Sequence, residues 1–579
     1  MANPTLIDSY LADFRAWLID ANFKDQQNNL SEEWLGKVFV DRLDSTSGET
    51  RTIGHFVSIF LPKGFPYQAP KVYCRDNEPL SPSWHLSPDQ CLCLWQEPNG
   101  WEPFTAAQSL LERIREWFGF YHSGSWPKNS IVPDLHLYFE NEGLVILGEN
   151  WNITSDVQHG DFALWRDDKN SQFFPSFVVP REQPGSNEIK PKPEKRLIDN
   201  LLWNESFKFY LGFWFRLHQP FIPPRNLAEL CSLIDRESGW VEGQCVELFA
   251  ARLGRDSNVL GFSIALGYPD YFRSERWLFL WVQKPKGHKL RFSNQANLAD
   301  VKIKSFRTAS ARKTDLIRRI AHISPGLEQK RVCIFGIGAL GGNVAVLLSK
   351  TGLGQIDLID SDILLPTNTI RHIAGLRSVG LPKTYCVQNI IKSHNPDCKT
   401  ELYDETWDIE QIKKIIRGSD LVIDTTANVP FSLYLNQICV SLNQPVLFST
   451  SYRRACIGRI VIRRANPEYQ DPCLYCYLQN RGRWSESEFP TIPQDPTSSF
   501  IEDGCGSPTE EADAVHLNFV ATLTAKLVPQ ILKDEKINGN LLVQVNEILP
   551  DSPRIFSSLG IHPFNNKCLQ NCGICQPRN

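Results

Sequence analysis

The sequence lacks both a strong net charge and a long apolar run. Its 61 Lys and Arg residues are offset by 65 Asp and Glu residues, which gives a formal net charge of −4 and a pI near 6.3. A chain with this balance has no bulk electrostatic attraction for nucleic acid or an anionic membrane surface. No apolar run approaches the roughly 20 residues of a membrane span. The expected partners are therefore proteins or small molecules.

The N-terminus also lacks the basic segment and uninterrupted apolar stretch of a signal peptide, because Asp8, Asp13 and Asp20 interrupt it. The chain nevertheless has 16 cysteines in 579 residues. Without an export signal, these cysteines are expected to be reduced thiols, metal ligands or nucleophiles rather than disulfides. We therefore expect a cytoplasmic protein.

The chain is too long for a single hydrophobic core. Fourteen of its 16 tryptophans precede residue 300, and the composition changes again after residue 127. We predict three domains, at residues 1–128, 129–305 and 306–579. The first has an α+β pattern, the second is mixed and without a chemical motif, and the third alternates strands and helices in an α/β pattern.

A glycine-rich turn opens the third domain. Residues 332–335 have the pattern of a buried strand, and a turn containing Gly336, Gly338 and Gly341 leads into a helical run. Such a turn lets backbone N–H groups and a helix N-terminus approach phosphates. A second strand ends at Asp360, where a carboxylate can hold a ribose hydroxyl. Alone, this pattern also fits a dinucleotide-dependent oxidoreductase.

The residues that follow favour adenylation over hydride transfer. Asp362, Asn368, Arg371 and Lys383 come next in order, and Asp424 ends another strand. A carboxylate that attacks the α-phosphate of ATP needs fixed cations and a divalent ion with carboxylate support. Arg371 and Lys383 supply cations, and Asp424 can serve Mg²⁺. Hydride transfer needs no such cluster.

From about Asp315 to the C-terminus, the sequence resembles the ubiquitin-activating and ThiF/MoeB adenylyltransferase family. The resemblance implies a doubly wound α/β fold, usually dimeric, that uses ATP and Mg²⁺. It also implies a nucleotide site formed by Gly336, Gly338, Gly341, Asp360, Asp362, Asn368, Arg371, Lys383 and Asp424. The family commonly has Thr-Asp-Asn where this chain has Thr426-Ala427-Asn428, so the metal role is assigned to Asp424.

Two arginines precede the first strand of this domain. In relatives, an arginine near the position of Arg318 and Arg319 reaches the γ-phosphate of the partner subunit. A solvated basic helix is the alternative, because Arg312 and Lys313 belong to the same run.

Two C-x-x-C pairs near the C-terminus predict a zinc site. Four thiolates suit a closed tetrahedral Zn²⁺ centre, and the resembling family has paired knuckles in the same order. Free buried thiols or a redox pair are the alternatives, and Cys568 is a possible substitute ligand. The predicted ligands are Cys473, Cys476, Cys572 and Cys575.

Cys505 is the candidate first nucleophile. It lies in a Gly- and Pro-flanked loop at residues 503–508, ahead of helical spacing at 512–527. A cysteine that accepts an acyl group from an adenylate should be exposed and partly thiolate. The acceptor cysteine of the resembling family occupies this region. The alternative is an incidental loop thiol.

Residues 1–128 resemble ubiquitin-conjugating enzymes, particularly their divergent bacterial relatives. The order that carries the resemblance is a turn at 65–72, then His85, then Cys91-Leu92-Cys93, then Trp101-Glu102-Pro103. The second nucleophile implied is Cys93, and Cys91 is the alternative.

The spacing around Cys93 supports this choice. Cys93 follows His85 by eight residues and Asp89 by four, as in the bacterial relatives. His85 orients the site or lowers the thiol pKa, or it is a packing residue. Ser87 stands where the eukaryotic pattern has an asparagine, so the oxyanion stabiliser is not identified.

The whole chain resembles the fused activating and conjugating enzymes of bacterial anti-phage CBASS operons. These relatives join the C-terminus of a cGAS/DncV-like nucleotidyltransferase to an amine. The resemblance implies adenylation of a partner's C-terminal carboxylate, thioesters on Cys505 and then Cys93, and an amide product. The rivals are a sulfur-carrier adenylyltransferase for thiamine or molybdopterin synthesis and a non-catalytic protein-binding module.

Overall fold

The computed structural model divides the chain into two compact units, Met1–Arg312 and Lys313–Asn579. The structure describes the following residues: 6–26, 32–43, 50–80, 85–87, 89–94, 101–124, 135–154, 156–168, 175–181, 191–200, 206–218, 221–253, 261–269, 275–283, 298–323, 325–404, 409–479, 499–501, 508–510, 512–548, 558–570 and 572–575.

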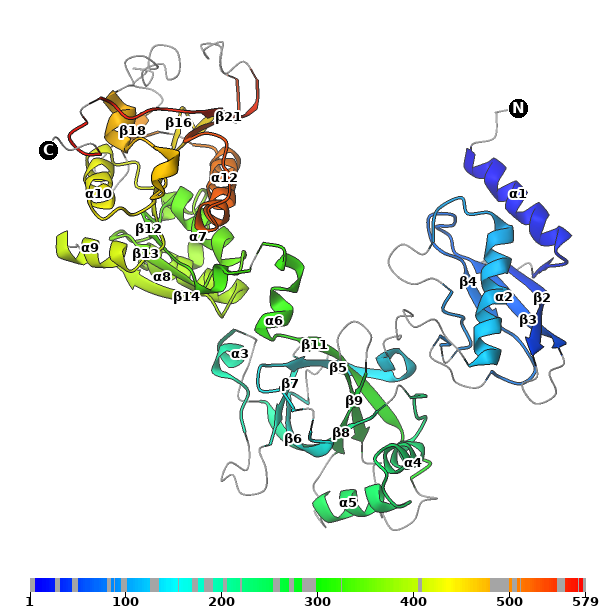
Figure 1. Cartoon of the computed structure of the whole chain (residues 1–579). Coiled ribbons are helices and arrows are strands. Elements are labelled where there is room, and N and C mark those ends of the chain that lie inside the picture. The colour runs from blue at the N-terminus through cyan, green and yellow to red at the C-terminus, as the bar shows by residue number, and fades with distance from the viewer. Residues whose placement is uncertain are drawn as a thin grey trace. The chain divides into compact units, whose positions relative to one another are not determined.

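The first unit begins with a four-stranded antiparallel sheet of order β1-β2-β3-β4. Side chains of β3 alternate, and His55, Val57 and Ile59 are buried on the inner face. Helix α2 packs on β2 and covers the sheet (Figure 1). This part is α+β, as expected. The elements are α1 (Leu6–Asp20), β1 (Lys24–Asp25), β2 (Glu32–Leu43), β3 (Thr50–Leu61), β4 (Lys71–Cys74) and α2 (Ala107–Ser123).

The rest of the first unit is a closed barrel, with strand order β10-β11-β5-β7-β6-β8-β9. Its strands are β5 (Glu140–Leu147), β6 (His159–Arg166), β7 (Ser176–Pro180), β8 (Lys208–Arg216), β9 (Gly261–Tyr268), β10 (Arg276–Gln283) and β11 (Ile303–Ser310). Its helical segments are η1 (Leu135–Tyr138), α3 (Lys195–Asn200), α4 (Leu227–Glu237) and α5 (Gln244–Leu253).

Aromatic side chains fill one core of the barrel. Trp151, Phe162, Trp214, Phe279 and Trp281 pack together there, and all are buried. A second core lies between the strands and helices α4 and α5. The tryptophan-rich middle segment of the sequence therefore forms the strands and the aromatic core of a barrel. Strand β11 continues this barrel beyond residue 305 to Ser310.

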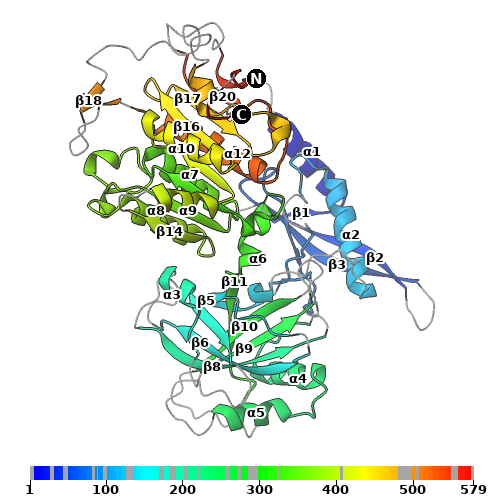
Figure 2. The same cartoon turned by 60° about the vertical axis from the view of Figure 1, so that its left-hand side comes forward.

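The second unit is built on an eight-stranded mixed sheet of order β14-β13-β12-β15-β16-β17-β20-β21 (Figures 1 and 2). The pairs from β14 to β16 are parallel and the remaining pairs are antiparallel. The strands are β12 (Arg331–Phe335), β13 (Gln355–Ile359), β14 (Lys399–Tyr403), β15 (Leu421–Asp424), β16 (Val446–Tyr452), β17 (Ile457–Arg463), β20 (Leu541–Val545) and β21 (Gly560–Phe564).

Helices cover both faces of this sheet. One buried cluster contains residues of α7, α8 and α12, and another contains residues of α9 and α10. The doubly wound α/β arrangement expected for this part of the chain is confirmed, with an antiparallel extension. The helices are α7 (Ala339–Ser349), α8 (Lys383–His394), α9 (Ile409–Arg417), α10 (Val429–Ser441) and α12 (Ala514–Leu532).

Helix α12 has the length and apolar composition of a membrane span, which the sequence analysis did not anticipate. It packs against α7 and β16, and Val520 and Val528 are fully buried. A helix that is apolar because the protein core surrounds it passes the same test. We interpret α12 as a core helix.

Candidate functional site

The strand order reverses around β12, which has β13 on one side and β15 on the other. Phe335 pairs with both Ile359 and Asp424, so the carboxyl ends of these three strands meet at one edge. Ligands of doubly wound sheets bind outside such an edge, where the order reverses. The turn after β12 and Asp360 after β13 both lie there.

The glycines of the turn allow close packing of the backbone. Gly336 has φ +86°, and a Cβ atom there would lie 2.9 Å from the Cα of Thr426. A Cβ at Gly341 would lie 1.9 Å from the carbonyl oxygen of Gly336. Gly338 is the N-cap of α7, whose first N–H groups have no partner within the helix. The strand, glycine-rich turn and helix expected from the sequence are therefore present.

Asp360, which directly follows strand β13, is hydrogen-bonded to the glycine-rich turn. Its carboxylate accepts the N–H of Ile337 at 2.6 Å and the N–H of Asp362 at 2.8 Å. Burial raises the pKa of Asp360, and the nearby Lys383 opposes that shift. Each oxygen keeps a further lone pair, so the carboxylate can still accept a ribose hydroxyl.

Lys383 is the first residue of α8 and forms an ion pair with Asp362. The Nζ atom lies 2.8 Å from the Asp362 carboxylate, and the Lys383 N–H donates to the Asp362 carbonyl at 3.0 Å. Asn368 accepts the N–H of Leu365 and so caps a short turn, and Arg371 follows it, half-buried. The structure thus brings Asp360, Asp362 and Lys383 together and carries Asn368 and Arg371 on the connecting segment.

Asp424 ends β15 at the same edge but is only 2% exposed. One oxygen accepts the N–H and the hydroxyl of Thr426, at 2.9 and 2.7 Å, and the other accepts the hydroxyl of Ser432. Burial raises the pKa of Asp424. A metal ion at Asp424 would compete with these partners. Ala427, where the family has aspartate, is exposed and has φ +55°.

His372 was missed by the sequence analysis. It is 6% exposed, its Nδ1 accepts the N–H of Ala374 at 3.0 Å, and its Nε2 lies 2.9 Å from the carbonyl oxygen of Ile337. A lone histidine gives no spacing pattern, and its partner Ile337 is 35 residues away in sequence. No sequence signal marked it.

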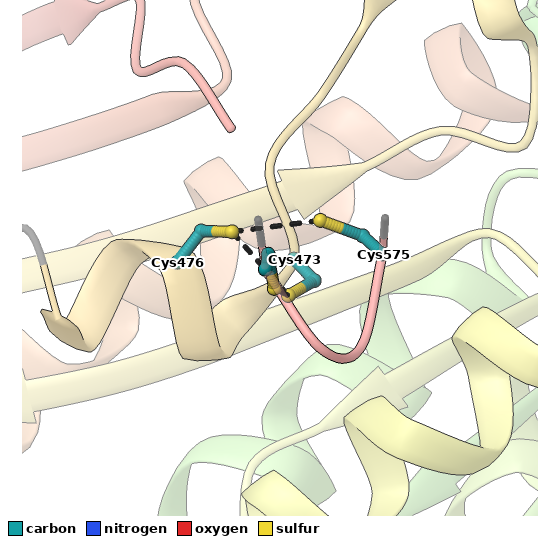
Figure 3. Close-up of side chains that lie close together, drawn as sticks. Cys473, Cys476 and Cys575 are labelled. Atoms are coloured by element: carbon teal, nitrogen blue, oxygen red, sulfur yellow. Dashed lines mark hydrogen bonds between the residues drawn. The ribbon is translucent and has the colours of Figure 1, made fainter. Parts of the chain in front are cut away.

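The four predicted zinc ligands converge, and Figure 3 labels three of them, Cys473, Cys476 and Cys575. The Sγ atom of Cys473 lies 3.8 Å from those of Cys476 and Cys572, and Cys476 lies 3.5 Å from Cys575. All four sulfurs lie within 4.8 Å of one another. A tetrahedral site with Zn–S bonds of about 2.3 Å places its sulfurs about 3.8 Å apart. The spacing and the donor set therefore fit zinc.

Cys568 lies beside this cluster. Its Sγ is 3.7 Å from that of Cys575 and 3.7 Å from the carbonyl oxygen of Asp471. The four other sulfurs already provide a closed tetrahedral set, so Cys568 is a neighbour of the cluster.

The two candidate cysteines of the first unit differ in exposure. Cys93 is exposed and Cys91 is half-buried. Burial, assisted by the charge of Asp89, raises the pKa of Cys91 to about 11. Because the thiolate is the nucleophile, these surroundings disfavour Cys91.

Two residues hold the segment that carries Cys93. The Cys93 N–H donates to the carbonyl of His85 at 2.9 Å, and Tyr138 donates its hydroxyl hydrogen bond to the carbonyl of Leu86. Burial lowers the pKa of His85 to about 4, so its ring is neutral near pH 7. Burial and the charge of nearby Cys93 raise the pKa of Tyr138. The sequence analysis did not identify Tyr138.

Cys505 lies outside the described residues. The strands on either side of its segment, β18 (Ser499–Ile501) and β19 (Pro508–Glu510), form a separate two-stranded sheet in which Ile501 pairs with Pro508 (Figure 2).

Arg318 lies in the short helix η3 (Arg318–Ile320), 3.9 Å from Asp315, and its side chain is 51% exposed. Its role across subunits stays a prediction.

Comparison with known proteins identifies the family of one part of this chain. Residues 323–544 match the ThiF family. The second unit carries a ThiF-family domain. The sequence-based resemblance to E1-like adenylyltransferases is thus confirmed for this domain, and the match leaves the first unit outside it.

Individual relatives cover the chain unevenly. The uncharacterized protein y4oA of Sinorhizobium fredii is 25% identical over 64% of this chain and 63% of its own length. The adenylyltransferase and sulfurtransferase MOCS3 of Dictyostelium discoideum is 29% identical over 30% of this chain and 37% of its own length. The chain thus spans less than two thirds of these relatives. A structure of E. coli MccB with ATP aligns with 44% of this chain and 69% of that chain, at 18% identity and a TM-score of 0.33.

Proposed function

We propose that the ThiF-family domain uses ATP to adenylate the C-terminal carboxylate of a partner protein. A carboxylate oxygen attacks the α-phosphorus, the bond to the β-phosphate breaks, and pyrophosphate leaves. The observation that carries the proposal is the shared edge of β12, β13 and β15, where the glycine-rich turn, Asp360 and Lys383 meet. Fixed cations and helix N–H groups stabilise the charge that develops on the phosphates. Bound Mg²⁺ would neutralise the charge of the leaving pyrophosphate. Asp424, the carboxylate proposed to support it, would exchange hydrogen bonds from Thr426 or Ser432 for the metal ion.

We further propose a thioester relay. The Cys505 thiolate attacks the acyl adenylate and AMP leaves. The Cys93 thiolate then attacks that thioester and releases Cys505. An amine finally attacks the second thioester, so that an amide forms and the Cys93 thiol is regenerated. The exposure of Cys93 on an α+β domain supports this order, as does the resemblance of residues 1–128 to conjugating enzymes.

The proposed partner is a cGAS/DncV-like nucleotidyltransferase in anti-phage CBASS defence. It rests on the resemblance of the whole-chain arrangement to the fused enzymes of those operons. The proposed location is the cytoplasm, as expected from the sequence.

We propose one zinc ion at the four-cysteine cluster and a homodimer of the ThiF-family domain. The support for the dimer is a dense group of exposed apolar side chains on the segment that carries Asn368 and Arg371. Ile370 is the most exposed, at 83%. The members of this apolar segment are Ile363, Ile370, Ile373, Leu376, Val379, Leu381 and Tyr385.

A sulfur-carrier adenylyltransferase is the second candidate function. Its support is the similarity of the domain to the MOCS3 proteins, which are named adenylyltransferases and sulfurtransferases. Both candidates predict adenylation, and only the relay predicts an amide product that requires Cys93.

ATP–pyrophosphate exchange tests the adenylation step. The full chain should exchange label only in the presence of a partner with a free C-terminal tail, and Lys383→Ala should reduce the rate at least tenfold. Lys392→Ala, which removes an exposed lysine from the same helix, is the matched control and should exchange normally. The proposal fails if no tail-bearing partner supports exchange, or if Lys383→Ala exchanges at the wild-type rate.

A further inference from the structure

The glycine-rich turn contains two peptide groups, and each of them is hydrogen-bonded to side chains that lie outside the turn. In the first plane, the Gly336 carbonyl accepts the hydroxyl of Thr425 at 2.6 Å, and the Ile337 N–H donates to Asp360 at 2.6 Å. A planar peptide held at both its carbonyl and its N–H cannot rotate.

The second plane joins Ile337 to Gly338, and its carbonyl is held by His372 across 2.9 Å. In a trans peptide the carbonyl and the N–H point in opposite directions. The hydrogen bond from His372 therefore also fixes the direction of the Gly338 N–H. Gly338 is the N-cap of α7, where N–H groups face an incoming phosphate.

The neighbours of the imidazole define its protonation state. The Ala374 N–H points at Nδ1 from 3.0 Å, so Nδ1 must be the acceptor. Nε2 then carries the proton and donates to the Ile337 carbonyl. Only the neutral ring with hydrogen on Nε2 makes both contacts. A doubly protonated ring would place two donors, Nδ1–H and the Ala374 N–H, face to face.

We propose that His372 is a positioning residue for ATP: its neutral imidazole sets the direction of the Gly338 N–H, and nucleotide affinity depends on that neutral form. The inference rests on the proposed function, since it requires that the turn binds the phosphates of ATP. It goes further by assigning a role to a residue that touches neither the nucleotide nor the acyl group.

The surroundings of His372 give the sign of the pH dependence. Burial lowers the pKa of His372, the Ile337 carbonyl opposes this, Lys383 at the start of α8 lowers it further, and Asp360 raises it. The folded pKa is below the ordinary value of about 6.5. The contact between Nδ1 and the Ala374 N–H is therefore complete above about pH 6.5. It is lost as the pH falls through the folded pKa, and the repulsion between the two N–H groups then displaces the ring from the Ile337 carbonyl.

The test is a titration of the full chain with ATP and Mg²⁺, by calorimetry, between pH 8 and pH 5.5. Wild type should keep its affinity between pH 8 and about 6.5 and lose it progressively below. His372→Gln keeps one donor and one acceptor but does not titrate, so its profile should be flatter. His372→Leu should bind about tenfold more weakly than wild type above about pH 6.5, as expected for a lost buried hydrogen bond, and this difference should shrink as the pH falls.

His394→Gln is the matched control, because it removes an exposed histidine from the last turn of α8. Phosphate groups also titrate near pH 6, but this contribution is common to all variants. The inference is overturned if His372→Leu binds ATP like wild type, or if His372→Gln retains the full wild-type pH profile. If His372→Leu does not fold, the profile of His372→Gln decides. A folded wild type that binds no ATP would overturn the proposed function as well.

Discussion

Cys91 and Cys93 have different surroundings although only one residue separates them. The N–H of Cys91 donates to the hydroxyl of Ser87 at 2.9 Å, and its half-buried thiol has a raised pKa. Cys93 is exposed. At the scale of single residues, exposure therefore distinguishes the candidate nucleophile from its neighbour.

Single-cysteine variants give a test of the relay that separates its steps. Cys505→Ala should still form the acyl adenylate but no covalent adduct, because adenylation needs neither cysteine. Cys93→Ala should stop with the acyl group on Cys505, giving a band that thiol reductant removes and no amide. Cys91→Ala should conjugate at nearly the wild-type rate. Reducing and non-reducing gels distinguish thioester from amide.

Two results would change this assignment. An inactive Cys91→Ala together with a fully active Cys93→Ala would move the second nucleophile to Cys91. Normal conjugation by both single variants would show that neither cysteine carries the acyl group.

Ala427 offers a second prediction at this scale. Its left-handed φ of +55° is one that aspartate adopts more readily than alanine, and the side chain is exposed. Ala427→Asp should therefore not lower the melting temperature. Its carboxylate adds an oxygen ligand at the edge where β15 ends, so half-maximal pyrophosphate exchange should need several-fold less Mg²⁺.

Asn428→Asp is the control for charge. Asn428 caps α10 by accepting the N–H of Phe431, and aspartate caps as well as asparagine does. It adds the same charge one residue further on and should leave the Mg²⁺ requirement nearly unchanged. An equal shift in both variants would show that the effect is general electrostatics rather than metal binding.

Much of the edge at which β12, β13 and β15 end was predictable from the sequence because its residues follow strands directly. Asp360 and Asp424 end strands, and parallel strands bring their carboxyl ends together. His372 and Tyr138 were not predictable, since each bonds a backbone carbonyl many residues away. A carbonyl acceptor leaves no trace in the side-chain pattern of either segment.

At the scale of elements, the barrel was the least predictable part. Its closure requires β5 to pair with β11, and β8 with β9, in parallel. Every residue of β9 is buried, so this strand shows no alternation of apolar and polar residues. Short apolar runs of this kind do not distinguish a buried strand from a buried helix. The strands around the glycine-rich turn were predictable because turn residues and acids mark their ends.

The four-cysteine cluster joins two elements that are distant in sequence. Cys473 directly precedes a helical segment, and Cys476 lies in its first turn. Cys572 and Cys575 lie near the C-terminus. Chelation should lower the melting temperature by about 10 °C, because zinc-binding free energy is also folding free energy. Scanning calorimetry with and without chelator measures this shift.

Metal analysis of variants identifies the ligands. Cys473→Ser should contain less than one zinc per chain, and Cys568→Ala should keep a full equivalent, since its sulfur lies outside the tetrahedral set. Freshly purified wild type without zinc would refute the site. Loss of zinc in Cys568→Ala would instead show that Cys568 replaces one of the four.

At the scale of the whole molecule, the apolar segment on the second unit predicts self-association. Ile370→Glu would place a charge in the centre of a buried apolar interface, and we expect the dimer to become a monomer at micromolar concentration. Ile409→Glu adds the same charge at an exposed residue at the start of α9 and should leave the dimer intact. Multi-angle light scattering distinguishes the two states. Wild type that is monomeric throughout the micromolar range would rule out the dimer.

The pairing of the first and last strands of the barrel limits how the barrel can be connected within a polypeptide chain. β5 and β11 pair in parallel, with Glu140 beside Lys304 at one end and Leu147 beside Ser310 at the other. The two ends of the barrel segment therefore lie about 20 Å apart. Domains that tolerate insertion into a loop, or circular permutation, have their ends close together. This barrel can be joined in series with its neighbours, but a circular permutant would need a linker of at least about six extended residues along its outer wall.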